Sequence, residues 1–465
     1  MNKVGFIDNP KLSAIINITI GLKKSWPRLI RLWLLIAIFI SLNSAAAALA
    51  DSSDKVAESV KLGRYAQSER KRTLDFNWSA WLETTIRQST YSHKPISMRQ
   101  RIWAETSIKS KGPLSAFVSG YVEGDFSVFT RYSYEKFGTA AFNEAYLTID
   151  TSRLDFILGL QQIRWGEADS MSAADVINPI DYRDPLATAR SNQRLSVVAA
   201  DVRADLGFGL LDLVIVPWPR FSSLPKSGSP WEPKALRYLR QADKAGIIVT
   251  REGQKARHTQ LGARFKLFRQ GFDLAFIYFR GYEHAPRFSL GFDQSVMAPA
   301  ATASYDTYET YALSAAVSLF NSTLRAEAAY KSNYPFQSSL ISVEKRDDFQ
   351  VVAGWDKNFF TNLIIQAQGF YFRYSGAEVW GVDRERYGIS FNLENKFFNE
   401  ALRSGVRGVY YLTSHDYCLE LFNEYDFDDH LKFKIGYMLL GGKDDGDIGQ
   451  YDKNDHVYAG IKYYF

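Results

Sequence analysis

The sequence contains a single cysteine, Cys418, among 465 residues. One thiol can form neither an intramolecular disulfide nor the C-x-x-C-H motif that attaches haem, so both are excluded. From residue 51 onward the chain also lacks any run of about 18 apolar residues, which excludes a transmembrane helix there. The six histidines are scattered and lie in no nucleophile or metal-ligand motif. We therefore expect no catalytic residues, no metal and no other cofactor.

An excess of charge is also missing. Residues 1–50 hold six of the 56 Lys and Arg and one of the 51 Asp and Glu, so the remaining chain carries 50 of each sign. The basic isoelectric point is therefore mostly a property of the first fifty residues. A nucleic-acid partner, which calls for a basic surface, is not expected.

The first fifty residues have the pattern of a signal peptide. Basic residues between Lys23 and Arg31 precede the apolar run 32–42, and Ala48, Leu49 and Ala50 fit the A-x-A cleavage pattern. The apolar run is shorter than the ~20 residues that span a bilayer. We expect cleavage after Ala50, a short periplasmic segment over 51–72, and one domain over 73–465. The short segment leaves no room for an N-terminal plug domain.

The chain is rich in aromatic residues, with 27 Tyr and 32 Phe, and these alternate with polar residues. Residues 431–437, for example, place Leu, Phe, Ile and Tyr on one face and Lys432 and Lys434 on the other. Such period-two runs cannot form a coherent apolar face in a helix, but they suit strands with lipid on one side and a polar lumen on the other. We predict strands near 74–88, 97–109, 113–124, 140–150, 154–164, 194–205, 209–217, 257–268, 271–281, 306–320, 322–333, 346–357, 361–374, 385–397, 401–413, 416–427, 430–441 and 456–465.

These segments predict an all-β fold, an antiparallel up-and-down transmembrane β-barrel of about 18 strands, with 16 as the alternative count. Short connections such as 111–113 and 269–271 alternate with long ones, including 165–193, 218–256, 282–305, 334–345 and 442–455. Short periplasmic turns and longer external loops are typical of outer-membrane barrels. The last segment ends on Tyr463, Tyr464 and Phe465, and Tyr463 and Phe465 fit the terminal signal that barrel-assembly machinery binds.

One segment carries a family resemblance. Residues 159–167 read GLQQIRWGE and residues 175–181 read DVINPID. This G-x-Q, W-G-E and I-N-P-x-D pattern resembles a family of proteobacterial β-barrel porins of unknown function. The resemblance covers about thirty residues and implies a porin-like protein without naming a substrate.

The same segment begins the loop 165–193, which is dense in charge and contains the turn formers Asn178-Pro179 and Asp184-Pro185. If this loop folds into the lumen, its side chains form the pore constriction. The alternative is that Trp165, Asn178 and Asp181 attach the loop to the barrel wall. The candidate constriction residues are Arg164, Trp165, Glu167, Asp169, Asp175, Asn178, Asp181, Arg183 and Asp184.

A second set of charges lies on the predicted lumen faces of the last strands. Arg403 and Arg407 should neighbour Glu420 and Glu424, with Lys432 and Lys434 on the next strand. Alternating basic and acidic side chains are usually cross-strand pairs that stabilise a wall, which we favour over a selectivity filter.

The sequence therefore predicts an outer-membrane porin or channel for small solutes of unknown identity. Its expected partners are membrane lipid and the assembly machinery, and either a monomer or a homotrimer fits the strand pattern. Two alternatives are an outer-membrane barrel enzyme, for which no motif is present, and a sheath around a periplasmic or surface partner.

Overall fold

The structure is a computed structural model that describes residues 74–92, 95–125, 139–168, 170–185, 193–252, 259–295, 297–339, 341–360, 362–377, 379 and 382–465. The chain divides into the units Met1–Arg72 and Thr73–Phe465, and the described residues belong to the second. The predicted signal peptide (1–50) and periplasmic segment (51–72) lie outside the described residues and stay predictions.

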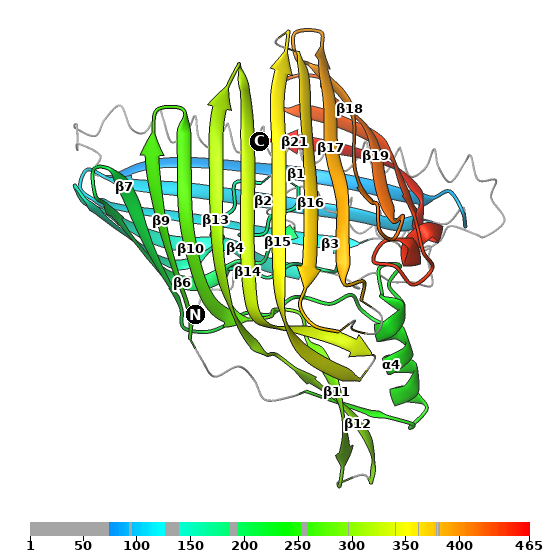
Figure 1. The fold of residues 1–465 in the computed structure, drawn as a ribbon. Helices are drawn as coiled ribbons and strands as arrows, with labels where there is room; N and C mark the ends of the chain where they lie inside the picture. The colour runs from blue at the N-terminus through cyan, green and yellow to red at the C-terminus, as the bar shows by residue number, and fades with distance from the viewer. Residues whose placement is uncertain are drawn as a thin grey trace, which may run out of the picture. The chain divides into compact units, whose positions relative to one another are not determined.

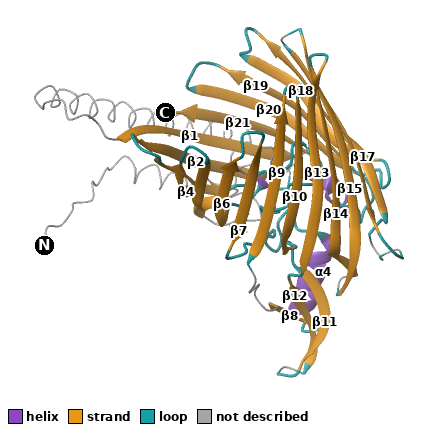
Figure 2. Cartoon of the chain, turned by 60° about the vertical axis from the view of Figure 1, so that its left-hand side comes forward, coloured by secondary structure: helices purple, strands orange, loops and turns teal. Residues whose placement is uncertain are grey.

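Eighteen strands form one closed antiparallel barrel (Figures 1 and 2). Each strand pairs with its neighbours along the chain, and β1 also pairs with β21, which closes the ring. Its strands are β1 (Leu74–Ser89), β2 (Pro95–Ser110), β3 (Leu114–Asp125), β4 (Thr139–Asp150), β5 (Leu154–Gln161), β6 (Val197–Asp205), β7 (Gly209–Val216), β9 (Gln260–Arg269), β10 (Phe272–Tyr282), β13 (Thr307–Leu319), β14 (Ser322–Ser339), β15 (Ser342–Phe359), β16 (Leu363–Tyr374), β17 (Glu385–Phe397), β18 (Leu402–Tyr411), β19 (Tyr417–Asp426), β20 (Leu431–Gly441) and β21 (His456–Tyr464). The predicted fold class and the count of 18 are confirmed.

The outer face carries two levels of aromatic side chains. Tyr278, Tyr311, Tyr330 and Phe349 lie in register on four adjacent strands toward the end with the long loops. At the opposite end, Phe320, at 84% exposure, occupies a hairpin turn, and Phe360 and Phe398 occupy equivalent turns. Ten residues separate Tyr330 from Phe320, which for a tilted strand corresponds to about 25 Å of height. This matches the apolar band of outer-membrane barrels.

The sequence missed several elements near the loop end. The prediction of a loop over 334–345 is wrong, because β14 and β15 extend into this segment as a long hairpin. Asn333 and Pro335 resemble a turn, but Asn333, at a φ of 55°, lies in a bulge between Lys331 and Tyr334, and Pro335 pairs with Lys345 of β15. The predicted strand 154–164 is also too long, because the ladder of β5 ends at Gln161.

The predicted loops 218–256 and 282–305 contain further structure. They contain helix α4 (Lys234–Lys244) and three strands, β8 (Val249–Glu252), β11 (Arg287–Asp293) and β12 (Ala298–Ser304). The three strands form a sheet separate from the barrel. Figure 1 shows α4 and β12 extending beyond the loop end of the barrel. Within the described part of the chain, no helix has the length and apolar character that a membrane span requires.

Candidate functional site

The described part of the connection between β5 and β6, residues 162–168, 170–185 and 193–196, folds into the barrel instead of away from it; we call it the third loop. Its buried apolar residues include Trp165, at 1% exposure, and Ile177. They join one cluster with inward-facing residues of seven wall strands, such as Val214, Phe279 and Phe370. Burial of this apolar surface holds the loop inside the barrel, because the same side chains would otherwise contact water.

A single carboxylate anchors the first half of the third loop. Glu327 of β14 is 1% exposed and accepts hydrogen bonds from the backbone N–H groups of Glu167 and Ala168 (2.6 and 2.7 Å) at Oε1. Its Oε2 accepts three more, from the backbone N–H groups of Ala173 and Ala174 and from the Ser172 hydroxyl. Five donors compensate the burial of this charge, so Glu327 fixes the path of the loop across the lumen.

Amide side chains anchor the two ends of the loop. Asn178 is fully buried; its Oδ1 accepts the N–H of Ile163 (2.7 Å) and its Nδ2 donates to the carbonyls of Gln161 and Leu195. On the far wall, Gln368 of β16 accepts the N–H of Ser170 and donates to the carbonyl of Met171. The loop is therefore tied to both β5–β6 and β16.

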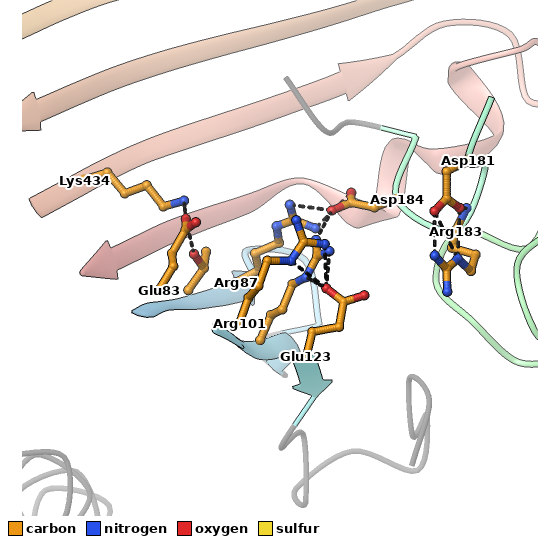
Figure 3. A network of polar contacts seen from close by, with 10 residues as sticks. Glu83, Arg87, Arg101, Glu123, Asp181, Arg183, Asp184 and Lys434 are labelled. Atoms are coloured by element: carbon orange, nitrogen blue, oxygen red, sulfur yellow. Dashed lines mark hydrogen bonds and ion pairs between the residues drawn. The ribbon is translucent and has the colours of Figure 1, made fainter. Parts of the chain in front are cut away.

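Charged side chains face the second half of the loop. The Arg87 guanidinium forms two hydrogen bonds of 3.0 Å with the Asp184 carboxylate, and Arg99 adds a third of 3.2 Å. Glu123 of β3 accepts hydrogen bonds from both Arg99 and Arg101 (Figure 3). Burial alone would raise the pKa of Asp184, but the guanidinium groups of Arg87 and Arg99 lower it to about 2. We call these five residues the charged ring.

The predicted wall charges form cross-strand pairs. Arg403 bonds to Glu424 and Arg407 to Glu420, each at 2.6 Å. The two lysines behave alike: Lys432 pairs with Asp426 at 3.0 Å, and Lys434 pairs with Glu83 of β1. This last contact crosses β21 and brings the wall charges next to the charged ring (Figure 3).

The predicted constriction residues lie in different environments of the third loop. Trp165 and Asn178 are buried against the wall, where Glu167 also bonds to Lys266 of β9 at 2.7 Å. Ion pairs within or next to the loop involve Asp175 with Arg194, and Asp181 with Arg183. Among these residues, Asp184 belongs to the charged ring, where it bonds to Arg87 and Arg99. The remaining two are Arg164, which is exposed and bonds to loop carbonyls, and Asp169, which lies outside the described residues.

Three cavities adjoin along the barrel. An outer cavity of about 580 Å³ lies at the loop end and an inner cavity of about 500 Å³ lies behind the third loop; Asp447 lines both. A third cavity is lined by Arg87, Arg99, Arg101 and Asp184 of the charged ring, and it shares Arg407, Glu420 and Met438 with the inner cavity. Consecutive cavities thus share lining residues from the loop end to the charged ring.

The acidic loop 442–455 is held by hydrogen bonds. Asp416 is 1% exposed and accepts the N–H groups of Lys443 and Ile448, while Asp455 accepts the N–H of Leu440. His415, which precedes Asp416 in the sequence, contacts the Tyr410 hydroxyl. Among the described residues, no group of three or more His, Cys, Asp or Glu is placed to hold a metal ion.

Sequence reasoning missed Glu327, Gln368 and the arginines of β1 and β2. Each has a polar side chain, but single polar residues are common on strands that have a lumenal face. Their partners in the third loop are 85 to 198 residues away in sequence, as for Arg99–Asp184 and Ser170–Gln368. Only the barrel closure brings them together, so no local signal marked them.

Residues 68–367 match the model of a family described as "Protein of unknown function (DUF1302)". The chain belongs to this family. The matched DUF1302 region covers more than half of the chain, from the start of the barrel to β16, and includes the third loop and Glu327. No curated protein matches the sequence significantly.

Solved structures with similar folds are bacterial outer-membrane porins. OccK5 (OpdH) of Pseudomonas aeruginosa aligns with a TM-score of 0.51 at 8% identity, over 84% of this chain and 98% of that one. OccK8 (OprE) of the same organism gives 0.51 at 9%, also over 84% and 98%. OccK3 (OpdO) gives 0.51 at 8%, over 84% and 96%. At these identities the similarity establishes the fold of this DUF1302 protein, a porin-like barrel of the outer-membrane type.

Proposed function

We propose that the protein is an outer-membrane channel for small solutes, and that the third loop and the charged ring form its constriction. The observation that carries the proposal is the series of three adjoining cavities inside a closed 18-stranded barrel. A barrel of this size is too wide to be filled by its own wall side chains. The inward third loop reduces this space, and each cavity still shares lining residues with the next.

The charges at the constriction support passage of polar solutes. Arg87, Arg99 and Arg101 lie on one wall, and the Asp184 carboxylate of the loop pairs with Arg87 and Arg99. Fixed groups of both signs at a narrow passage select by charge as well as by size. Replacing Asp184 with Asn would raise the excess of arginines over carboxylates in the charged ring from one to two, and we expect the cation-to-anion permeability ratio to fall about two- to fivefold.

The single cysteine provides a direct test. Cys418 lines the inner cavity and contacts Met438 there, at 3.3 Å between the sulfur atoms. The protein, purified from outer membranes and inserted in a planar bilayer, should show discrete single-channel openings. A small methanethiosulfonate reagent should lower that conductance stepwise by attaching to Cys418.

The matched control is Cys418→Ser, which should conduct normally and not respond to the reagent. Folded protein that never conducts would contradict the proposal. Unchanged conductance after complete modification of Cys418 would remove the inner cavity from the permeation path. Neither an enzyme nor a partner sheath has a specific observation in its favour among the described residues.

A further inference from the structure

We propose that the inner cavity is a binding site for small amphipathic solutes, meaning molecules with one apolar group and one uncharged or zwitterionic hydrogen-bonding head. The inference rests on the proposed channel function, because such a solute reaches the cavity through the barrel. Three features carry it: a polar side, an apolar side, and charges that are paired.

The polar side lies on β16 and β17. Asn392 donates from Nδ2 to Gln366 Oε1 at 2.9 Å, and Ser390 lies beside them in the cavity lining. The Oδ1 atom of Asn392 is buried and has no hydrogen-bond partner among the described residues. Because a buried acceptor without a donor is unfavourable, a small rotation of the Asn392 side chain toward the cavity would let a solute hydroxyl or ammonium group donate to this oxygen.

The apolar side lies on β19, β20 and the loop 442–455. Met438 and Leu440 are 5% and 3% exposed and pack with Cys418, Ile448 and Tyr451 in one cluster. The Tyr451 hydroxyl donates to a carbonyl of the loop between β7 and β9, at Trp231, which fixes the ring at the edge of the cavity. Sulfur atoms and an aromatic ring favour contact with a flat apolar group.

Four charged residues of the inner cavity form two ion pairs, and Asp447 adds a third carboxylate. Arg325 pairs with Asp356 on one side, and Arg407 pairs with Glu420 at 2.6 Å on the other. A solute with a single negative charge would have to disrupt one of these pairs, whereas a zwitterionic head can interact with both members of a pair. The cavity, at about 500 Å³, falls within the ~300–1,000 Å³ of small-molecule sites.

The test uses L-phenylalanine as the probe and glucose as a similarly sized control without an apolar group. We expect L-phenylalanine to slow modification of Cys418 by the methanethiosulfonate reagent in the intact protein, and to interrupt the single-channel current in proportion to its concentration. Glucose should do neither. Protection of Cys418 is measured without current, so it reports binding even in a barrel that does not conduct.

Two variants test the two sides of the site. Asn392→Ala removes the unpaired acceptor and Ile448→Ser removes an apolar contact on a loop, and each should raise the half-protecting concentration of L-phenylalanine about three- to tenfold. Ser414→Ala, in the outer cavity, should leave it unchanged.

Two results would overturn this inference alone: a conducting channel whose Cys418 reacts equally fast with and without L-phenylalanine, or equal protection by L-phenylalanine and glucose. Absence of conductance would instead contradict the proposed function. Native folding of each variant is checked by its heat-dependent electrophoretic mobility, and the wild-type comparison of the two solutes stands if a variant does not fold.

Discussion

Glu327 is the residue on which the interior of the barrel most depends, because five donors of the third loop converge on its carboxylate. Replacing it with Gln places an NH₂ group opposite N–H donors and removes the charge that strengthens these bonds. We expect the free energy of local opening of the loop to fall by about 2–4 kcal/mol, with the barrel intact. Hydrogen exchange at the Ala173 and Ala174 amides should accelerate about thirtyfold to several-hundredfold. Glu309→Gln, on the outer side of the same wall, is the control, and equal exchange in both variants would refute the anchoring role.

The Asp184 contact should be insensitive to moderate acid. Its pKa is lowered to about 2 by Arg87 and Arg99, below the ~3.9 of an unfolded aspartate. Its contribution to stability is therefore fully present above the unfolded pKa and is lost as the pH falls toward 2. Ion selectivity, measured as reversal potential, should not change between pH 7 and 5 on account of this residue. A selectivity change centred near pH 4 that is absent in Asp184→Asn would contradict the assignment.

For single residues, the sequence identified one partner of each contact and not the other. Asp184 and Asn178 stood out because they precede prolines in a charged loop, yet nothing local indicated that one would meet Arg87 and the other the ends of its own loop. The wall pairs were easier to predict, because hairpin register alone places Arg403 opposite Glu424.

The third loop packs against wall positions where a glycine leaves room for a loop side chain. Gly262 of β9 is such a position, because an added Cβ would lie 2.5 Å from Cη2 of Trp165. Gly262→Ala should displace the indole and destabilise the loop by about 1–3 kcal/mol, as overpacking does. Gly354→Ala is the matched control on β15, where the nearest atom to the new Cβ would be 3.8 Å away. Limited proteolysis of the loop should distinguish them, and equal resistance would show that Trp165 moves without cost.

Strands were predictable as elements and loop structure was not. Each barrel strand presents an apolar face to lipid, so a period of two is required throughout its length. The loops are under no such constraint, and α4 was missed although Leu236 and Leu239 have helical spacing. The extension of β14 and β15 escaped notice because Asn333 and Pro335 are turn formers in most settings.

The whole molecule depends on the pairing of its first and last strands. Phe465 donates its backbone N–H to the carbonyl of Ala80, and its ring contacts Tyr463 with 5.3 Å between centroids. Phe465→Ala should lower the amount of heat-modifiable protein in the outer-membrane fraction several-fold, because the predicted assembly signal is lost while the strand pairing is kept. The control is Phe427→Ala, an exposed aromatic of the turn between β19 and β20. Equal yields of the two variants would remove Phe465 from the assembly step.

The closure at β1 is uneven. β1 pairs with β2 through fifteen residue pairs but with β21 through only nine, from Trp81 to Ser89. Every other junction of the wall is a hairpin whose strands are also joined covalently at a turn or loop, whereas this one is held by hydrogen bonds and side-chain contacts alone. If the barrel were pulled from its ends under mechanical load, the wall should therefore tear first along this line. The other seventeen strand junctions of the barrel would then separate one after another.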